Sequence, residues 1–264
     1  MRPPARSLFV LFICASALAQ SPPSDDALLS KTRALYDAPF TTTLVSFDCA
    51  VQFDWKNHFV ETLGPISPAA SWTLDHLKPI QHRVFVDRSG ATISEIPKIP
   101  DLTKVPHGAD LERTFEAMVS SGLNAWLPFS TNVILPVRPT TSAFKKDISG
   151  YTLTMSGTDI SATLTLAPDL RILSGVSRLP QPLRFETTFI PGPNGYLLQS
   201  LKTTPDITAT NWSATFGYTY QAVQEFQLPS IVTVKPAMPE TWHYSLTDCK
   251  VVTGIPSESR PPAR

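Results

Sequence analysis

The segment between Val45 and Trp55 carries the clearest alternation of apolar and polar side chains in the chain. Its odd positions are apolar or aromatic, whereas its even positions are small, polar or acidic. Because successive side chains of a β-strand point to opposite faces, this pattern predicts a strand with one apolar and one solvated face. We therefore expect a sheet that buries one face against an apolar layer.

Similar alternating segments fill the second half of the chain. Turn signals separate them every ~8–12 residues, which is typical of an antiparallel sheet or barrel. An earlier hairpin is predicted over 83–95, with its turn at Ser89-Gly90. No linker divides the chain, so we expect one domain over 20–253 and a disordered tail at 254–264. The strands expected in the second half span 151–155, 160–166, 170–176, 183–189, 196–201, 212–220, 231–234 and 242–251.

Three helices are predicted in the first half of the chain. The first spans 24–36, where Ser24 is suited to cap the helix, and the second is a short helix near 69–77. The third runs from 110 to 121, and Gly122 is its expected end. Its apolar residues recur on one face, so we expect this helix to lie over the sheet; they are Leu111, Phe115, Met118 and Val119.

Residues 1–19 have the features of a signal peptide. Arg2 and Arg6 precede a short apolar run at 8–13, and an A-x-A cleavage site ends at Ala19. The bulky residue before Cys14 disfavours a lipoprotein signal. The apolar run is far shorter than the ~20 residues of a membrane-spanning helix, and no longer run follows it. We expect an exported protein without an integral membrane span, in a periplasm or outside the cell.

The composition limits the possible fold classes and the possible partners. The chain has 26 prolines against 11 glycines, and interior prolines cost a helix about 3 kcal/mol each, so a mainly helical fold is excluded. Positive and negative side chains balance at 22 each, without a basic stripe. Nucleic acid is therefore not an expected partner.

Two cysteines, Cys49 and Cys249, remain after the predicted cleavage, near opposite ends of the exported chain. An oxidising compartment favours a disulfide between them, provided that the first and last strands lie side by side. Closing so long a loop could stabilise the fold by roughly 5 kcal/mol through the denatured state. The alternative is two separate buried thiols that act as small apolar side chains.

The segment 226–234, Phe-Gln-Leu-Pro followed by an alternating strand, is similar to a phrase near the end of the periplasmic lipoprotein carriers. The order of elements, from exported N-terminal helix to C-terminal meander, also resembles these LolA-like proteins. The resemblance implies an α+β fold in which an antiparallel sheet curves into an open half-barrel covered by two or three helices. It also implies an apolar cavity that holds acyl chains.

An open barrel of this kind would have its cavity lined by aromatic and aliphatic side chains of the strands and the mid-chain helix. The alternative for each of these residues is plain core packing between sheet and helix. The expected ligand is a hydrophobic small molecule or a lipid. The candidate lining residues are Phe47, Val51, Phe53, Trp55, Phe115, Met118, Trp212, Phe216 and Tyr218.

Enzyme chemistry has little support in the sequence. Ser142 and Lys145 match the S-x-x-K spacing of penicillin-recognising enzymes, but the partner motifs are absent and the pair is expected in a loop. The five histidines follow no metal-binding spacing, so we expect no metal and no cofactor. The favoured hypothesis is a non-enzymatic binder of an apolar ligand. The alternative is an envelope structural or protein-interaction module without a cavity, and a hydrolase ranks last.

Overall fold

The computed structural model describes residues 24–55, 71, 75, 81–96, 108–137, 139–157, 160–178, 182–205, 213–237 and 241–254. The expected signal peptide at 1–19, almost all of the expected helix at 69–77 and the tail beyond 254 lie outside these residues.

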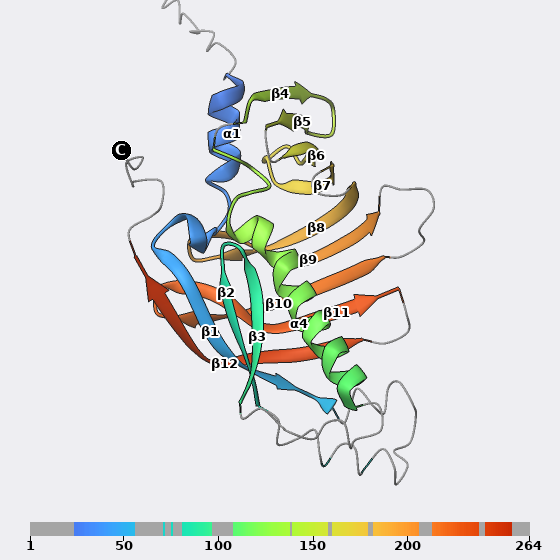
Figure 1. The fold of residues 1–264 in the computed structure, drawn as a ribbon. Helices are drawn as coiled ribbons and strands as arrows, with labels where there is room; N and C mark the ends of the chain where they lie inside the picture. The colour runs from blue at the N-terminus through green and yellow to red at the C-terminus, as the bar shows by residue number, and fades with distance from the viewer. Residues whose placement is uncertain are drawn as a thin grey trace, which may run out of the picture.

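Most of the described chain forms one antiparallel sheet of twelve strands (Figure 1). This confirms the expected antiparallel sheet with accompanying helices. The strands are β1 Leu44–Phe53, β2 Gln81–Asp87, β3 Gly90–Ile96, β4 Thr141–Lys146, β5 Tyr151–Ser156, β6 Ser161–Leu166, β7 Ile172–Ser177, β8 Leu183–Gly192, β9 Gly195–Pro205, β10 Ala214–Val223, β11 Phe226–Pro236 and β12 Trp242–Thr253.

The sheet order is a meander with one return of the chain. Strands β4 to β12 lie next to one another in sequence order, and β1 then pairs with β12 and carries β2 and β3 beyond it. Among the described strands, β3 and β4 form the two edges, so the sheet is open. The pairing of the first strand with the last depends on contacts between residues about 200 positions apart in the sequence.

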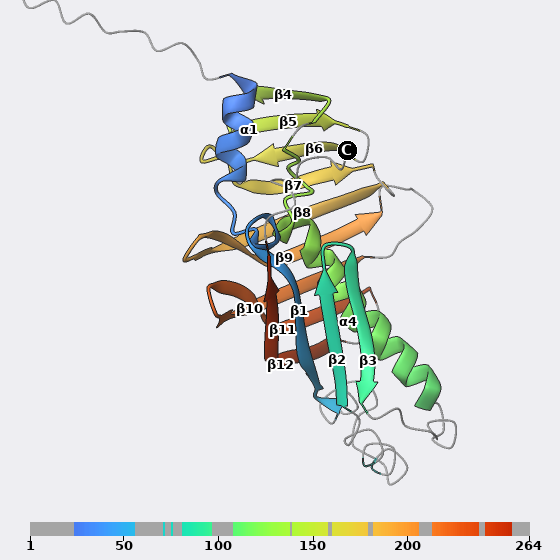
Figure 2. The same cartoon turned by 60° about the vertical axis from the view of Figure 1, so that its left-hand side comes forward.

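The sheet curves around the long helix α4 (Gly108–Ser130). Figures 1 and 2 show the β2–β3 hairpin on one side of this helix and the strands β9 to β11 on the other. The helix α1 (Asp25–Arg33) lies beside β4 to β7, and a short 3-10 helix, η1 (Pro39–Thr41), leads into β1. The predicted N-terminal helix is confirmed, although it ends at Arg33 and not at residue 36, and the Ser24 hydroxyl accepts a hydrogen bond from the Ala27 amide at 3.3 Å.

The expected end of the mid-chain helix at Gly122 is wrong. Helix α4 continues through Gly122 to Ser130, although Pro128 lies inside it. A Cβ at Gly122 would meet the Tyr244 hydroxyl at 2.5 Å and Val232 Cγ1 at 2.9 Å. The glycine is therefore needed where the helix backbone touches the sheet, and it does not end the helix. The part of the helix beyond Gly122 contributes buried side chains up to Ser130.

Strand β4 is a second departure from the expectation, because residues 142–145 were expected to form a loop. The strand is short and lies at the sheet edge, with most of its side chains exposed, so its sequence shows little apolar alternation. Strand β11 is also longer than expected, since it begins at Phe226.

We expect Gly122→Val to destabilise the fold by about 3 kcal/mol, because the new side chain would push α4 away from β11 and β12. Urea unfolding followed by circular dichroism measures this loss. Ala117→Val is the matched control, since Ala117 is exposed on the same helix and the change there costs only helix propensity, about 0.7 kcal/mol or less. Equal losses for both variants would contradict the close approach.

Candidate functional site

The predicted lining residues that the structure describes lie on the concave side of the sheet or on α4. Phe47 and Val51 on β1, and Phe216 and Tyr218 on β10, are buried. Phe53 and Met118 are half-buried against the same core. Trp212 lies outside the described residues.

The first half of α4 packs into an aromatic cluster made of Phe53, Trp55, His82, Phe115 and Trp242. The Phe115 ring is central, with centroid distances of 5.2 Å to Phe53, 5.4 Å to Trp55 and 4.6 Å to His82. Phe53 also stacks on Trp242 at 5.2 Å. Ring pairs of this kind add about 0.5–1.5 kcal/mol each beyond the area that they bury. Three of these five residues, Phe53, Trp55 and Phe115, are among the predicted lining residues.

His82 was missed because its position in the cluster depends on strand register. It lies opposite Val51 on the concave side of β2, and 3% of its surface is exposed. Burial lowers the pKa of His82 to about 4, and Nδ1 has no hydrogen-bond partner among the described residues. The imidazole is therefore neutral in the folded protein at pH 7. Only its place in the alternation of β2 could have indicated burial from the sequence.

Two buried tyrosines fix the middle of α4 to the sheet. The Tyr218 hydroxyl donates to the carbonyl of Gly122 at 2.8 Å, and the Tyr244 hydroxyl donates to the carbonyl of Val119 at 3.0 Å. Burial raises the pKa of both phenols well above the usual value, so both stay protonated and able to donate. Both bonds end on helix carbonyls, which the close approach at Gly122 brings within reach.

Farther along α4, Trp126 packs edge-on against Phe47 at 6.1 Å and against Phe40 of η1 at 6.1 Å. Phe47 is fully buried in this contact. In the described part of the concave face, α4 therefore lies over β1 and β10. Four of the predicted lining residues touch it: Phe47, Phe53, Trp55 and Tyr218.

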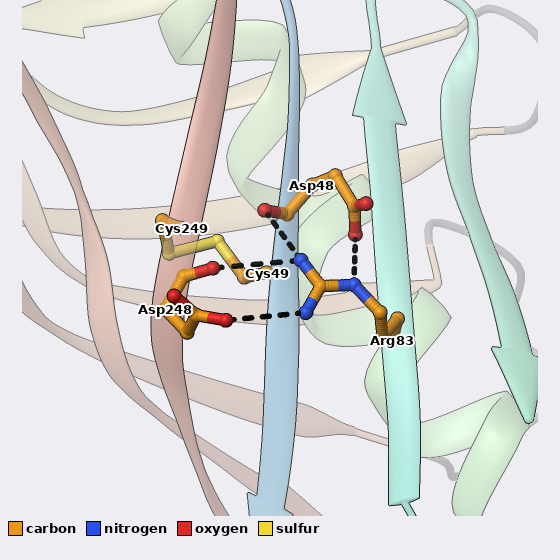
Figure 3. Close-up of polar contacts among 5 residues, drawn as sticks. All are labelled: Asp48, Cys49, Arg83, Asp248 and Cys249. Atoms are coloured by element: carbon orange, nitrogen blue, oxygen red, sulfur yellow. Dashed lines mark hydrogen bonds and ion pairs between the residues drawn. A yellow bond between two sulfur atoms is a disulfide. The ribbon is translucent and has the colours of Figure 1, made fainter. Parts of the chain in front are cut away.

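On the opposite side of β1, Arg83 of β2 reaches across to β12 (Figure 3). Its Nε donates to Asp48 Oδ1 at 2.9 Å, and one terminal nitrogen lies 3.6 Å from Asp248 Oδ2. The other terminal nitrogen contacts the backbone carbonyls of Asp48 at 3.3 Å and Asp248 at 3.4 Å. Asp248 has a φ of +47° at an irregularity in the β1–β12 pairing, which turns its carbonyl towards Arg83. This arginine is fully engaged in joining three strands.

The two cysteines beside this arginine form a disulfide between β1 and β12, with an S–S distance of 2.04 Å. The bond connects Cys49, which is fully buried, to Cys249, and the two residues are 200 positions apart. The Gln221 side chain donates to the Leu246 carbonyl at 2.7 Å and lies 3.5 Å from the Cys249 sulfur. The disulfide and Arg83 thus connect the β1–β3 arm to the C-terminal strand.

The outer face of β5 to β9 has a different character. Threonine and serine side chains dominate it, together with Arg184 and a Glu186–Lys202 ion pair at 3.8 Å. Two shallow hollows of about 360 and 490 Å³ adjoin there and share Thr163, Val176 and Arg184. This polar surface is typical of the solvated face of an antiparallel sheet.

The other candidate catalytic and metal-binding residues do not form a site in the described part of the chain. Ser142 and Lys145 lie three residues apart on β4 and therefore point to opposite faces, so they are not a nucleophile and its base. Within the described ranges, no group of three or more histidine, cysteine, aspartate or glutamate side chains is arranged to hold a metal ion. No described helix is both long enough and apolar enough to cross a membrane.

No protein-family model matches this chain, and searches of curated proteins and of solved structures each found no match.

We expect replacement of both cysteines by alanine to destabilise the protein by about 2–5 kcal/mol, because the denatured chain regains the freedom of a 200-residue loop. Urea unfolding under non-reducing conditions measures the loss. Wild-type protein unfolded in urea with a reductant present should show the same deficit. An unchanged unfolding midpoint for the double variant would show that the bond does not stabilise the fold.

The free energy of unfolding should fall on acidification below pH 6.5, the usual pKa of histidine. The unfolded state then binds a proton at His82, whereas the buried imidazole of the folded protein does not. The loss should continue down to about pH 4 and reach about 3 kcal/mol. His82→Leu should flatten this part of the stability profile measured by urea unfolding. His243→Gln, at an exposed position on β12, is the control and should leave the slope unchanged.

Proposed function

We propose that this chain is an exported, non-enzymatic protein that binds an apolar ligand, a lipid or its acyl chain, between the concave face of the sheet and α4. The observation that carries the proposal is an open sheet whose concave face is lined with aromatic side chains and covered mainly by one helix. A LolA-like half-barrel carrier, the family that the sequence resembles, would work in this way.

The contacts between α4 and the sheet are of a kind that a ligand could displace. They are mainly apolar and aromatic, and such contacts are not directional, so an acyl chain can replace them. The described side-chain hydrogen bonds between α4 and the sheet are few. Tyr218 and Tyr244 donate to helix carbonyls, Trp126 is hydrogen-bonded to Tyr220, and the Asn124 side chain accepts a bond from the Ala91 amide at 3.1 Å.

The aromatic cluster is the proposed entry for the chain. Phe53 and Met118 are half-buried there, whereas Phe115 beside them is fully buried. A chain that slides in beside Phe115 would keep the rings covered while α4 shifts outward. Each buried methylene contributes about 0.8 kcal/mol, so a long acyl chain can offset the helix contacts that it replaces.

A second candidate is an envelope protein-interaction module that needs no cavity. It is favoured by three exposed apolar side chains on β1, β2 and β12: Val45, Phe85 and Val252, which are 46%, 44% and 55% exposed. A protein partner would cover this patch and leave α4 in place.

The test is a chemical cross-link that fixes α4 to the sheet. Cysteines introduced at Ala91 and Asn124, which are in hydrogen-bond contact, can be joined by a short bismaleimide without affecting the native disulfide. We expect the unlocked protein to take up a fluorescent fatty acid and the locked protein to bind it at least tenfold more weakly. Native mass spectrometry of protein purified without detergent should also show a bound lipid.

The matched control joins cysteines at Thr188 and Ser200, whose hydroxyls are 2.8 Å apart on the exposed face of β8 and β9. This cross-link should not change uptake. Equal uptake by the locked and unlocked protein would contradict a site beneath α4. A protein that carries no lipid and takes up none would favour the interaction module.

A further inference from the structure

A small cavity lies at the other end of α4 from the aromatic cluster. It is enclosed by the link between α1 and β1, the last turns of α4, and the strands β8 to β11. Its volume is about 10 Å³, which is room for roughly one water-sized group. Aromatic side chains form most of its wall: Tyr36, Trp126, Phe129, Phe189, Tyr196 and Tyr220.

Asp37 is the one charged side chain among the described residues that line this cavity. Asn194 hydrogen-bonds to its carboxylate, whereas Oδ2 is buried and has no hydrogen-bond partner in the described part of the chain. Burial raises the pKa of Asp37. Its backbone is held in place, because the Asp37 amide donates to the Tyr196 carbonyl at 3.1 Å. A buried carboxylate oxygen without a partner is costly unless a cation or donor meets it.

The other polar groups of the wall have acceptor capacity left. The Ser130 hydroxyl donates its hydrogen to the Leu127 carbonyl at 3.0 Å, so only its lone pairs remain. The Tyr220 hydroxyl donates to the Leu198 carbonyl at 2.7 Å and is also hydrogen-bonded to Trp126, whereas Gln227 in the wall has an amide oxygen that can accept. These acceptors would meet a group that only donates hydrogen bonds.

The ring faces favour a positive charge over a neutral donor, because aromatic π-systems attract cations. The Tyr196 ring already carries one cation, the Arg171 guanidinium at 5.3 Å from its centroid. The carboxylate partner of Arg171 is Asp169, at 2.7 Å.

We propose that this cavity receives the primary ammonium group of an amphiphilic ligand, with Asp37, Ser130 and Gln227 as hydrogen-bond acceptors. An ammonium group has three N–H donors and the size of a water molecule, whereas a trimethylammonium group is too large. The inference rests on the proposed function, since the apolar part of the ligand would follow α4 towards the aromatic cluster. Phe115 lies eleven residues before Trp126, roughly 16 Å along the helix.

The experiment compares two matched pairs of probes by isothermal titration calorimetry at pH 7 and below their micelle concentrations. Dodecylamine and dodecan-1-ol differ in the ammonium charge. Lysophosphatidylethanolamine and lysophosphatidylcholine differ in methylation of the ammonium, and they test whether a lipid head group is the source. We expect the primary ammonium of each pair to bind about tenfold or more tightly, as for a charged hydrogen bond.

Asp37→Asn should abolish the preference for dodecylamine and leave the affinity for dodecan-1-ol unchanged. Its unfolding midpoint at pH 7 should not be lower than that of the wild type, because the buried charge is removed. Gln227→Leu is a second variant and should weaken dodecylamine binding more than dodecan-1-ol binding. Glu186→Gln, on the outer face, is the control and should keep the full preference.

The outcomes separate the two proposals. If neither dodecyl probe binds, the proposed apolar site is wrong, and the ammonium site that depends on it falls as well. If both bind equally and Asp37→Asn has no effect, the ammonium site is wrong and the apolar site stands. If dodecylamine is preferred but the two lysophospholipids bind equally, the ligand is a simple alkylamine and a lipid head group is excluded.

Discussion

The close approach of α4 to the sheet at Gly122 is the constraint on which the rest of the fold depends. With no side chain at this position, the helix backbone lies against Val232 and Tyr244. At that distance, the hydroxyls of Tyr218 and Tyr244 reach the carbonyls of the helix, and the buried side chains of α4 meet those of β1 and β10. An open sheet of twelve strands has one large apolar face, and α4 supplies much of the surface that covers it.

This arrangement also constrains how the proposed ligand would bind. Because α4 occupies the concave face in the described part of the protein, an apolar ligand has to compete with the helix for the same aromatic surface. The two ends of α4 differ chemically. The aromatic cluster around Phe115 is apolar apart from the neutral His82, whereas the cavity near Trp126 contains the carboxylate of Asp37. An amphiphile with a cationic head would match this polarity along one helix.

Two connections on the two faces of β1 keep the sheet wrapped around α4: the disulfide on its buried face and the Arg83 contacts on its outer face. The disulfide joins β1 to β12, and Arg83 extends the connection to β2 through both Asp48 and Asp248. The β2–β3 hairpin lies against α4, and Asn124 bonds to the backbone of β3. The arm formed by β1 to β3 is therefore attached both to the last strand and to the helix, which fixes one wall of the concave face.

Local pattern was enough to predict most of the elements. The alternation in 45–55 predicted β1, the turn signals predicted the meander, and Ser24 marked the start of α1. Pattern failed where the deciding contact comes from far along the chain. Gly122 has the signature of a helix end, but its neighbours Val232 and Tyr244 are more than 100 residues away. Strand β4 was missed because an edge strand with exposed side chains has little apolar alternation.

The sequence by itself determined the antiparallel architecture, the apolar face and the residue types on it, because alternation, turn residues and helix caps act over a few positions. Tertiary structure alone decided that β1 pairs with β12, that α4 covers the concave face, and that Asp37 lies in a ring of aromatic side chains from four parts of the chain. These features depend on strand register and on the packing of distant segments, which no local pattern specifies.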